Sequence, residues 1–372
     1  MLHDEAFELE RILNAGLRAP SGDNLQPWRF VASDESIDVF LVQERTHNVY
    51  DYKKAGSLVA TGTAIENLLI ASAGAGRFTE LTLYPNPGNP LHLAHILFRK
   101  GGRDENLGSE LRRLESFIYT RNTNRNPYRD DELSKEQQRE FQNIVEQSSI
   151  RGRLSMVGDP TRKRQLAKHL SFNERLIFTN RCLHNALYRN IRWTRREVRR
   201  SRDGLDIRSL ELPVVERFLF ACMRPWPVAW LLSWFGAAAI SARRSERVFA
   251  RSGALGAIIM DGATEQDLVN SGRLMERIWL AATGMGLSMQ PAFFFVTVGL
   301  RKNGNDLDIF SKTQAQRAVA SFREINNLFE VGEGAITMLF RIGTALEPPG
   351  SKSVRMYPET MINYRKGEPA SK

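Results

Sequence analysis

The sequence contains two copies of one helical segment, and this repeat limits the possible folds more than any other feature. Residues 62–76 align without gaps to residues 272–286, with three glycines, one glutamate and the apolar positions in register. Further along, residues 97–101 correspond to residues 339–343 in the same order. Amphipathic helices share a period, so the apolar positions alone could agree by chance. Two blocks in one order, with glycines and glutamate matched, indicate an internal duplication.

We therefore predict two halves, residues 1–105 and 110–372, related by a pseudo-two-fold axis as in a fused dimer. The predicted fold class is α+β, in which each half has an antiparallel-type sheet flanked by helices. The second half is longer, which predicts a helical insertion at about 172–251 and a further helix near 314–329. A chain of 372 residues is long enough for two such units.

Apolar periodicity and turn residues give the order of elements in the first half. The predicted elements are a helix at 6–18, strands at 29–32 and 37–42, a helix at 57–73, and strands at 81–84 and 93–99. His92 and His95 would face opposite sides of the last strand. Neither the six histidines nor the two cysteines have a metal-binding spacing, so the sequence predicts no metal site.

Residues 19–28, Ala-Pro-Ser-Gly-Asp-Asn-Leu-Gln-Pro-Trp, join the first helix to the first strand. The two prolines restrict φ to about −65° and remove two amide donors, while Gly22 admits conformations closed to other residues. Ser21, Asn24 and Gln26 add neutral hydrogen-bonding groups that suit the edge of a polar heterocycle. The alternative is an ordinary turn that leads into a strand.

A basic motif opens the second half. Arg121 and Arg125 lie four residues apart with Thr123 between them. Guanidinium groups pair with phosphate oxygens and a threonine hydroxyl adds a donor, so the motif suits a phosphate. A solvated basic turn is the alternative.

These motifs resemble the nitroreductase family of FMN-dependent flavoproteins. Residues 19–28 resemble the loop with which one subunit reaches FMN across the dimer interface, and residues 121–125 resemble the R-x-S-x-R phosphate motif. Residues 343–361 resemble the closing segment of the family, which makes Lys352 and Arg355 candidate phosphate ligands. In the family, the turn equivalent to residues 284–291 lies beside the reactive edge of the flavin. Alternatively, that turn only caps a helix before a buried strand at 293–296.

The resemblance implies one FMN between the two halves, because the first half has the loop and the second has the phosphate motif. The implied cofactor-binding residues are Pro20, Ser21, Gly22, Asn24, Gln26, Arg121, Thr123, Arg125, Gln290, Pro291, Lys352 and Arg355. It also implies an oxidoreductase that takes electrons from NADH or NADPH and passes them to a nitroaromatic, quinone or similar acceptor. Flavin chemistry needs no catalytic side chain, and none is predicted. The alternatives are a flavin-storage protein with a closed lid and a specialised biosynthetic FMN oxidase or dehydrogenase.

The insertion combines seven arginines within residues 189–202 with Trp226, Trp230 and Trp234. It is either a solvated basic helix packed by its aromatic side or a lid, in which arginines meet NADPH or an acidic substrate and tryptophans restrict access. Residues 225–240 are apolar but shorter than the ~20 residues of a membrane span, so they predict a helix, with an interfacial membrane contact as the alternative.

The formal net charge of +10 favours an anionic partner, such as a phosphate-bearing cofactor, an acidic protein or a membrane surface. No nucleic-acid recognition motif accompanies it. The N-terminus lacks the pattern of a secretion signal, and the two cysteines fit a reducing compartment, so we expect a cytoplasmic protein. A pseudo-dimer within one chain predicts a monomer or a further homodimer that acts on small molecules.

Overall fold

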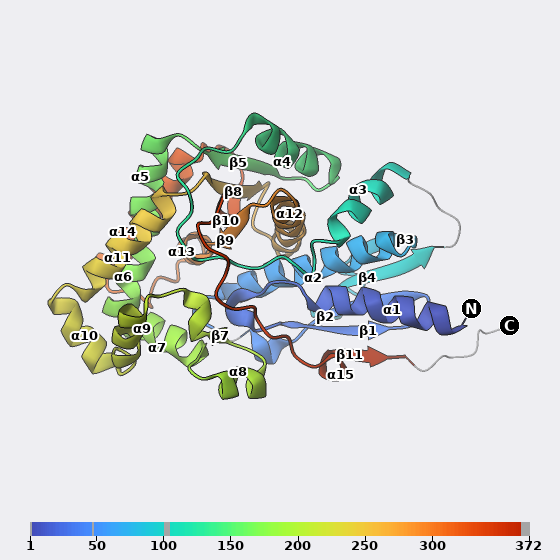
Figure 1. Cartoon of the computed structure of the whole chain (residues 1–372), viewed down its shortest axis with the longest axis horizontal. Coiled ribbons are helices and arrows are strands. Elements are labelled where there is room, and N and C mark those ends of the chain that lie inside the picture. The colour runs from blue at the N-terminus through green and yellow to red at the C-terminus, as the bar shows by residue number, and fades with distance from the viewer. Residues whose placement is uncertain (1, 47, 100–104, 366–372) are drawn as a thin grey trace.

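Two antiparallel-type sheets, one from each predicted half, pack on either side of two long helices, α2 and α12 (Figure 1). The computed structural model describes residues 2–46, 48–99 and 105–365. The repeat partners Lys100 and Gly101 lie outside these residues.

In the first half every predicted element is present. Its elements are α1 (Leu2–Leu17), β1 (Trp28–Ala32), β2 (Ser36–Leu41), α2 (Ala55–Gly74), β3 (Phe78–Leu83) and β4 (His92–Arg99). Helix α3 (Glu105–Glu115) crosses the predicted boundary between the halves. The strands form a sheet in the order β11-β1-β2-β4-β3. The short strand β11 (Ile362–Tyr364), from the end of the chain, joins its edge parallel to β1. The C-terminal segment therefore crosses back onto the first half.

The second half repeats this arrangement. Outside the insertion its elements are α4 (Lys135–Gln147), β5 (Arg153–Val157), α5 (Pro160–Leu170), β8 (Ala254–Met260), α12 (Glu265–Gly284), β9 (Ser288–Pro291), α13 (Phe294–Asn303), α14 (Lys312–Leu328), β10 (Ala335–Gly343) and α15 (Pro358–Met361). Its sheet has the order β5-β8-β10-β9. In both halves two strands precede the repeated helix and two follow it, and the last strand lies inside the sheet. The common order of strands agrees with the predicted duplication.

The predicted insertion is helical and lies between α5 and β8. Its elements are α6 (Phe172–Thr179), α7 (Arg181–Asn190), β6 (Ile191–Arg192), α8 (Arg195–Ser201), β7 (Leu205–Asp206), α9 (Val214–Cys222), α10 (Trp226–Trp234) and α11 (Ala237–Ala250). Gly236, with φ of 96°, breaks the apolar run 225–240 between α10 and α11. Across the described ranges, no helix combines the length and apolarity that crossing a bilayer requires.

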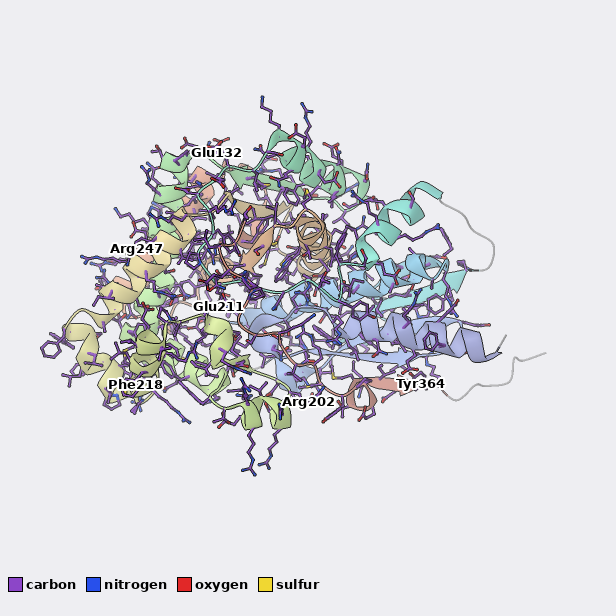
Figure 2. All side chains as sticks on the ribbon, in the orientation of Figure 1. Glu132, Arg202, Glu211, Phe218, Arg247 and Tyr364 are labelled. Atoms are coloured by element: carbon purple, nitrogen blue, oxygen red, sulfur yellow. The ribbon has the colours of Figure 1, made fainter. Side chains whose placement is uncertain are left out.

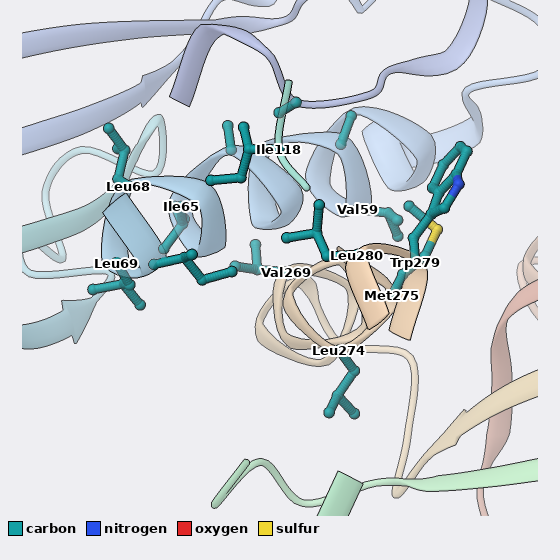
Figure 3. Packing of buried hydrophobic residues seen from close by; sticks show 14 of the residues in the cluster. Val59, Ile65, Leu68, Leu69, Ile118, Val269, Leu274, Met275, Trp279 and Leu280 are labelled. Carbon is teal, nitrogen blue, oxygen red and sulfur yellow. The ribbon is translucent and has the colours of Figure 1, made fainter. Parts of the chain in front are cut away.

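Helices α2 and α12 cross at the two glycines that the sequence repeat aligns. A Cβ atom on Gly62 would overlap the backbone of α12 at Val269, and one on Gly272 would overlap the backbone of α2 at Val59. Figure 3 shows apolar side chains of the two helices, among them Val59, Val269 and Leu280, meeting where the ribbons approach. The reciprocal contact is what a two-fold axis between the halves requires, and it explains why both copies have glycine there.

The aligned glutamates make different contacts. On α2, Glu66 is fully buried, and its carboxylate accepts from the Nε atoms of Arg273 at 2.8 Å and Arg277 at 2.5 Å. Burial raises the pKa of Glu66, but the two arginines outweigh it and bring the pKa below its usual value. On α12, Glu276 is equally buried and pairs instead with Arg121, at 3.2 Å from its Nε. One copy of the glutamate therefore stabilises the helix pair, and the other anchors the basic motif.

Two predictions about local structure are wrong. Residues 293–296 are not a strand, because β9 ends at Pro291 and Phe294 begins α13. The run is apolar because successive residues at the start of α13 are all buried. Short apolar runs do not distinguish a strand from a helix.

His92 and His95 also do not face opposite sides. A bulge in β4 passes over Leu93, so that Val39 pairs with Ala94 while Phe40 pairs with His92. One extra residue reverses the alternation, and both imidazoles contact the same oxygen of Asp38 at 2.8 Å.

Candidate functional site

A cavity of about 490 Å³ lies between the two halves and receives residues from both. This volume is in the range of small-molecule and cofactor sites, about 300–1,000 Å³. Of the predicted cofactor-binding residues, those that line it are Pro20, Ser21, Gly22, Asn24, Arg121, Thr123, Arg125, Gln290, Pro291, Lys352 and Arg355. Gln26 does not. The structure thus brings together segments that lie more than 300 residues apart in the chain.

The loop 19–28 does not use the conformational freedom of Gly22, and other residues of the loop have left-handed backbone instead. Gly22 has no left-handed conformation, whereas Asp23, Asn24 and Gln26 have φ of 51°, 54° and 51°. Asparagine and aspartate tolerate this region, but glutamine rarely adopts it, and each such residue costs about 1–3 kcal/mol. The surrounding contacts must therefore hold the loop in place.

Those contacts come from the C-terminal segment and from the insertion. The Oδ1 of Asn24 accepts from a terminal nitrogen of Arg355 at 2.7 Å. The Oε1 of Gln26 accepts from the backbone N of Met356 at 2.8 Å, and its Nε2 donates to the carbonyl of Arg202 at 2.9 Å. Both amides thus have partners within the protein, and their contact with a heterocycle stays a prediction. They attach the C-terminal segment and the insertion to the loop.

Four basic side chains gather at one end of the cavity, and we call them the cationic cluster. Its members are Arg18, Arg121, Lys352 and Arg355. Burial, then Arg121 and Arg18, lower the pKa of Arg355 to about 9. Burial and the three arginines also lower the pKa of Lys352. These cations destabilise one another, and an anion placed among them would relieve the repulsion.

The cationic cluster has excess positive charge and, within the described ranges, unpaired hydrogen-bond donors that such an anion would satisfy. Among the described residues, Glu276 is the carboxylate that pairs with the cluster, through Arg121. The Nε of Arg355 and the Oγ of Ser351 are buried without a hydrogen-bond partner in the described part of the chain. A phosphate would satisfy such donors. Arg18 was missed from the sequence, although it directly precedes the loop 19–28.

Arg125 lies in a different environment from Arg121. Its guanidinium donates to the carbonyl of Ser209 at 2.9 Å, and its backbone N donates to the Glu211 carboxylate. The charged groups that act on it include Glu211, Asp23 and Glu174, and none belongs to the cationic cluster. The basic motif therefore splits, with Arg121 at the cationic end and Arg125 beside acidic groups.

Two carboxylic acids that sequence reasoning missed lie in this second part of the cavity. Asp23 accepts from the Nδ2 of Asn190 at 2.6 Å and from the Nδ2 of Asn48 at 3.2 Å. Glu174 comes from α6 of the insertion and also lines the cavity. Burial raises the pKa of both carboxyls. Asp23 lies within the loop 19–28 but was not singled out there, and no motif marks Glu174, so the fold identifies both as cavity acids.

The insertion forms an apolar wall of the cavity. Side chains from α6, α9 and α11 line it, among them Ile177, Phe178, Phe220 and Val248. The seven arginines of 189–202 do not line it, nor do Trp226, Trp230 and Trp234. The cavity arginine of the insertion is instead Arg244 on α11. The arginines and tryptophans of the lid interpretation therefore lie outside the cavity lining, and the lid itself stays a prediction.

Strand β9 closes the cavity from the second half. Gln290 and Pro291 line it, and the Oε1 of Gln290 accepts from the Nε of Arg341 at 2.7 Å. Arg341 is fully buried and also donates to the carbonyl of Asn126 at 2.9 Å, which ties the basic motif to the sheet. The backbone from Gln290 to Ala292 is thereby held at the edge of the cavity.

The fold and the cavity define an α+β protein with a partly cationic cavity between two similar halves. No family model matches the chain. An uncharacterised Mycobacterium tuberculosis protein, MT1398, is 31% identical over 350 residues, which are 91% of this chain and 46% of that protein. The provisionally assigned NAD(P)H nitroreductase acg of the same species is 38% identical over 81 residues, 22% of this chain and 24% of that protein. The chain thus spans about half the length of the first relative.

Solved nitroreductases are similar as well. NfnB from Mycobacterium smegmatis, solved as an FMN-dependent enzyme with NADPH, gives a TM-score of 0.38 at 15% identity over 70% of this chain and 100% of that one. A nitroreductase assigned in Anabaena variabilis gives a TM-score of 0.46 at 11% identity over 91% and 88%. The chain is nitroreductase-like in sequence, as its motifs predicted.

Proposed function

We propose that the chain binds one FMN between its halves and acts as an NAD(P)H-dependent flavoprotein oxidoreductase. The observation that carries this proposal is the cationic cluster in a cofactor-sized cavity that the insertion lines with apolar side chains. An amphiphilic ligand with an anionic tail fits a cavity that has both cationic and apolar lining residues. FMN has that form, with a phosphate at the end of a chain and a flat ring system.

In this proposal Arg121, Lys352 and Arg355 hold the phosphate, together with Arg18. FMN, when bound, supplies hydride and single-electron transfer. The apolar residues of α6, α9 and α11 exclude water, and the loop 19–28 with Gln290 fixes the position of the ring. Because burial raises the pKa of Glu174, its carboxyl holds a proton to a higher pH than an exposed glutamate does.

The name of acg, and the NADPH bound to NfnB in its solved structure, support a nicotinamide donor. A nitroaromatic or quinone is the proposed acceptor, because an apolar wall favours a flat, weakly polar molecule. One chain supplies both parts of the cavity, so the proposal requires no second copy.

Flavin storage is a second candidate, favoured by the insertion itself. Its helices cover one side of the cavity, and Asn190 and Arg202 attach it to the loop 19–28. A cover that does not open would retain flavin but exclude nicotinamide.

The test is to purify the protein, measure flavin absorbance, and add NADH or NADPH without oxygen. Rapid bleaching on addition of the donor supports the oxidoreductase. Bound flavin that stays oxidised with either donor, yet bleaches with dithionite, supports storage. Protein that neither contains nor takes up FMN contradicts both.

A further inference from the structure

The insertion exposes an apolar surface at the end of the molecule opposite both marked termini (Figure 1). Helices α9 and α10 and the start of α11 form it, and we call it the apolar tip. Phe218, Trp234 and Phe235 are 68%, 75% and 79% exposed. Val214, Leu231 and Ile240 are also exposed. Soluble monomers rarely expose so many large apolar side chains together, so the tip requires a covering partner.

Nearly all of the net positive charge of the chain lies in the same segment. Residues 172–251 contain sixteen arginines and seven aspartates and glutamates, a formal charge of +9 out of the total of +10. The remainder of the chain is close to neutral. The apolar tip is therefore part of a strongly basic segment.

Helix α11 has both exposed apolar and exposed basic side chains on one face. Ile240 is exposed near its start, and Arg243 and Arg247 follow three and seven residues later on the same side. Both arginines are exposed, as is Arg251 just after the helix. Figure 2 shows Phe218 and Arg247 at this end of the molecule. This order of side chains, apolar at the extremity and then arginines, matches the order of acyl chains and anionic headgroups at a membrane surface.

We propose that the apolar tip inserts into the surface of a membrane that contains anionic phospholipids. Its aromatic and aliphatic side chains would enter the boundary between headgroups and acyl chains, and the arginines would contact the lipid phosphates. Tryptophan favours this depth, because its ring is apolar with one polar edge. The helices are too short to span the bilayer, so the contact is peripheral.

Charge decides against a second copy of the chain as the partner. A two-fold contact through the tip would bring two segments of +9 together. Anionic lipid instead neutralises the arginines. The same helices line the cavity with Phe220 and Val248, so the tip and the cavity occupy opposite sides of one helical layer.

The experiment is flotation of the full chain with vesicles of phosphatidylcholine alone or mixed with phosphatidylglycerol. We expect binding to the mixed vesicles that weakens with added salt, and much weaker binding to phosphatidylcholine alone. Phe218→Ser with Trp234→Ser should weaken binding more than about tenfold. Arg243→Gln with Arg247→Gln should weaken binding to the mixed vesicles by roughly tenfold or more.

Phe7→Ser is the matched control, because Phe7 is 71% exposed but lies on α1 in the first half. It should bind like the wild type. The proposal is overturned if the wild type does not float, or if the tip variants and the control bind equally. It is also overturned if light scattering shows a wild-type dimer that the tip variants lose, because a second copy would then cover the surface.

Discussion

Replacing Arg355 with glutamine should weaken the binding of FMN but not of riboflavin. The two ligands share the ring and differ by the phosphate, so their comparison isolates the cationic cluster. A hydrogen bond to a charged group contributes about 1.5–3 kcal/mol, and about 1.4 kcal/mol corresponds to a factor of ten. The Kd for FMN should therefore rise roughly 10- to 150-fold.

The free protein should lose little stability. Arg355 donates to Asn24 at 2.7 Å and to the carbonyl of Arg18 at 3.0 Å, and these contacts are partly lost. The loss is offset because repulsion from Arg121 and Arg18 is relieved. We expect the free energy of unfolding to change by less than about 1 kcal/mol.

The assay is quenching of flavin fluorescence on titration with protein that has been freed of flavin. Arg196→Gln is the matched control, because Arg196 is an exposed arginine of α8 that does not line the cavity. Equal weakening of FMN and riboflavin by Arg355→Gln would refute the assignment of the cluster to the phosphate. So would equal affinity of the wild type for both ligands.

Three further predictions concern the helices and the buried acids. Gly272→Ala should destabilise the protein by at least about 2 kcal/mol in urea unfolding, because its Cβ would overlap the backbone of α2. Glu66→Gln should cost about 3–5 kcal/mol at pH 7 by leaving buried arginines unpaired. Since the pKa of Glu66 is lowered on folding, this difference should shrink as the pH falls below about 4. Glu174 has a raised pKa, so Glu174→Gln should gain stability relative to the wild type as the pH rises from about 4 to 7, measured by thermal unfolding.

Each of these has a control or a contrary result. Gly22→Ala adds a Cβ with no atom within 4 Å, so its stability should match the wild type. A pH-independent cost for Glu66→Gln would show that its charge does not stabilise the helix pair. A relative loss of stability for Glu174→Gln between those pH values would contradict a carboxyl whose burial outweighs the effect of Arg244 and Arg125.

Sequence patterns predicted the secondary structure well where apolar residues recur with a clear helical or strand period. The apolar period of α1 and the repeated α2 and α12 gave the helices, and matched glycines gave their relation. The pattern failed at 293–296, where burial on all sides removes the periodicity. It also failed at His92 and His95, because a β-bulge depends on pairing with β2 and leaves no signal in β4 itself.

The candidate site was predictable only in part, for a similar reason. Contiguous motifs revealed the loop 19–28 and Arg121, since their residue types are unusual in sequence. Arg18 and Glu174 carry no such pattern, and Asp23 lies in the loop without a predicted role, so all three become candidates only because the fold places them in the cavity. The separation of Arg125 from Arg121 likewise follows from the packing of Ser209 and Glu211 against the motif.

The amino-acid sequence alone determined that two similar units exist and which residue types each offers. Local periodicity and short motifs depend on neighbours along the chain, so they can be found without the fold. Tertiary structure decided which charges meet, because the cationic cluster assembles from the end of α1, the basic motif and the C-terminal segment. It also decided that the arginines of 189–202 and the three tryptophans stay outside the cavity, since other side chains of α6, α9 and α11 line it instead.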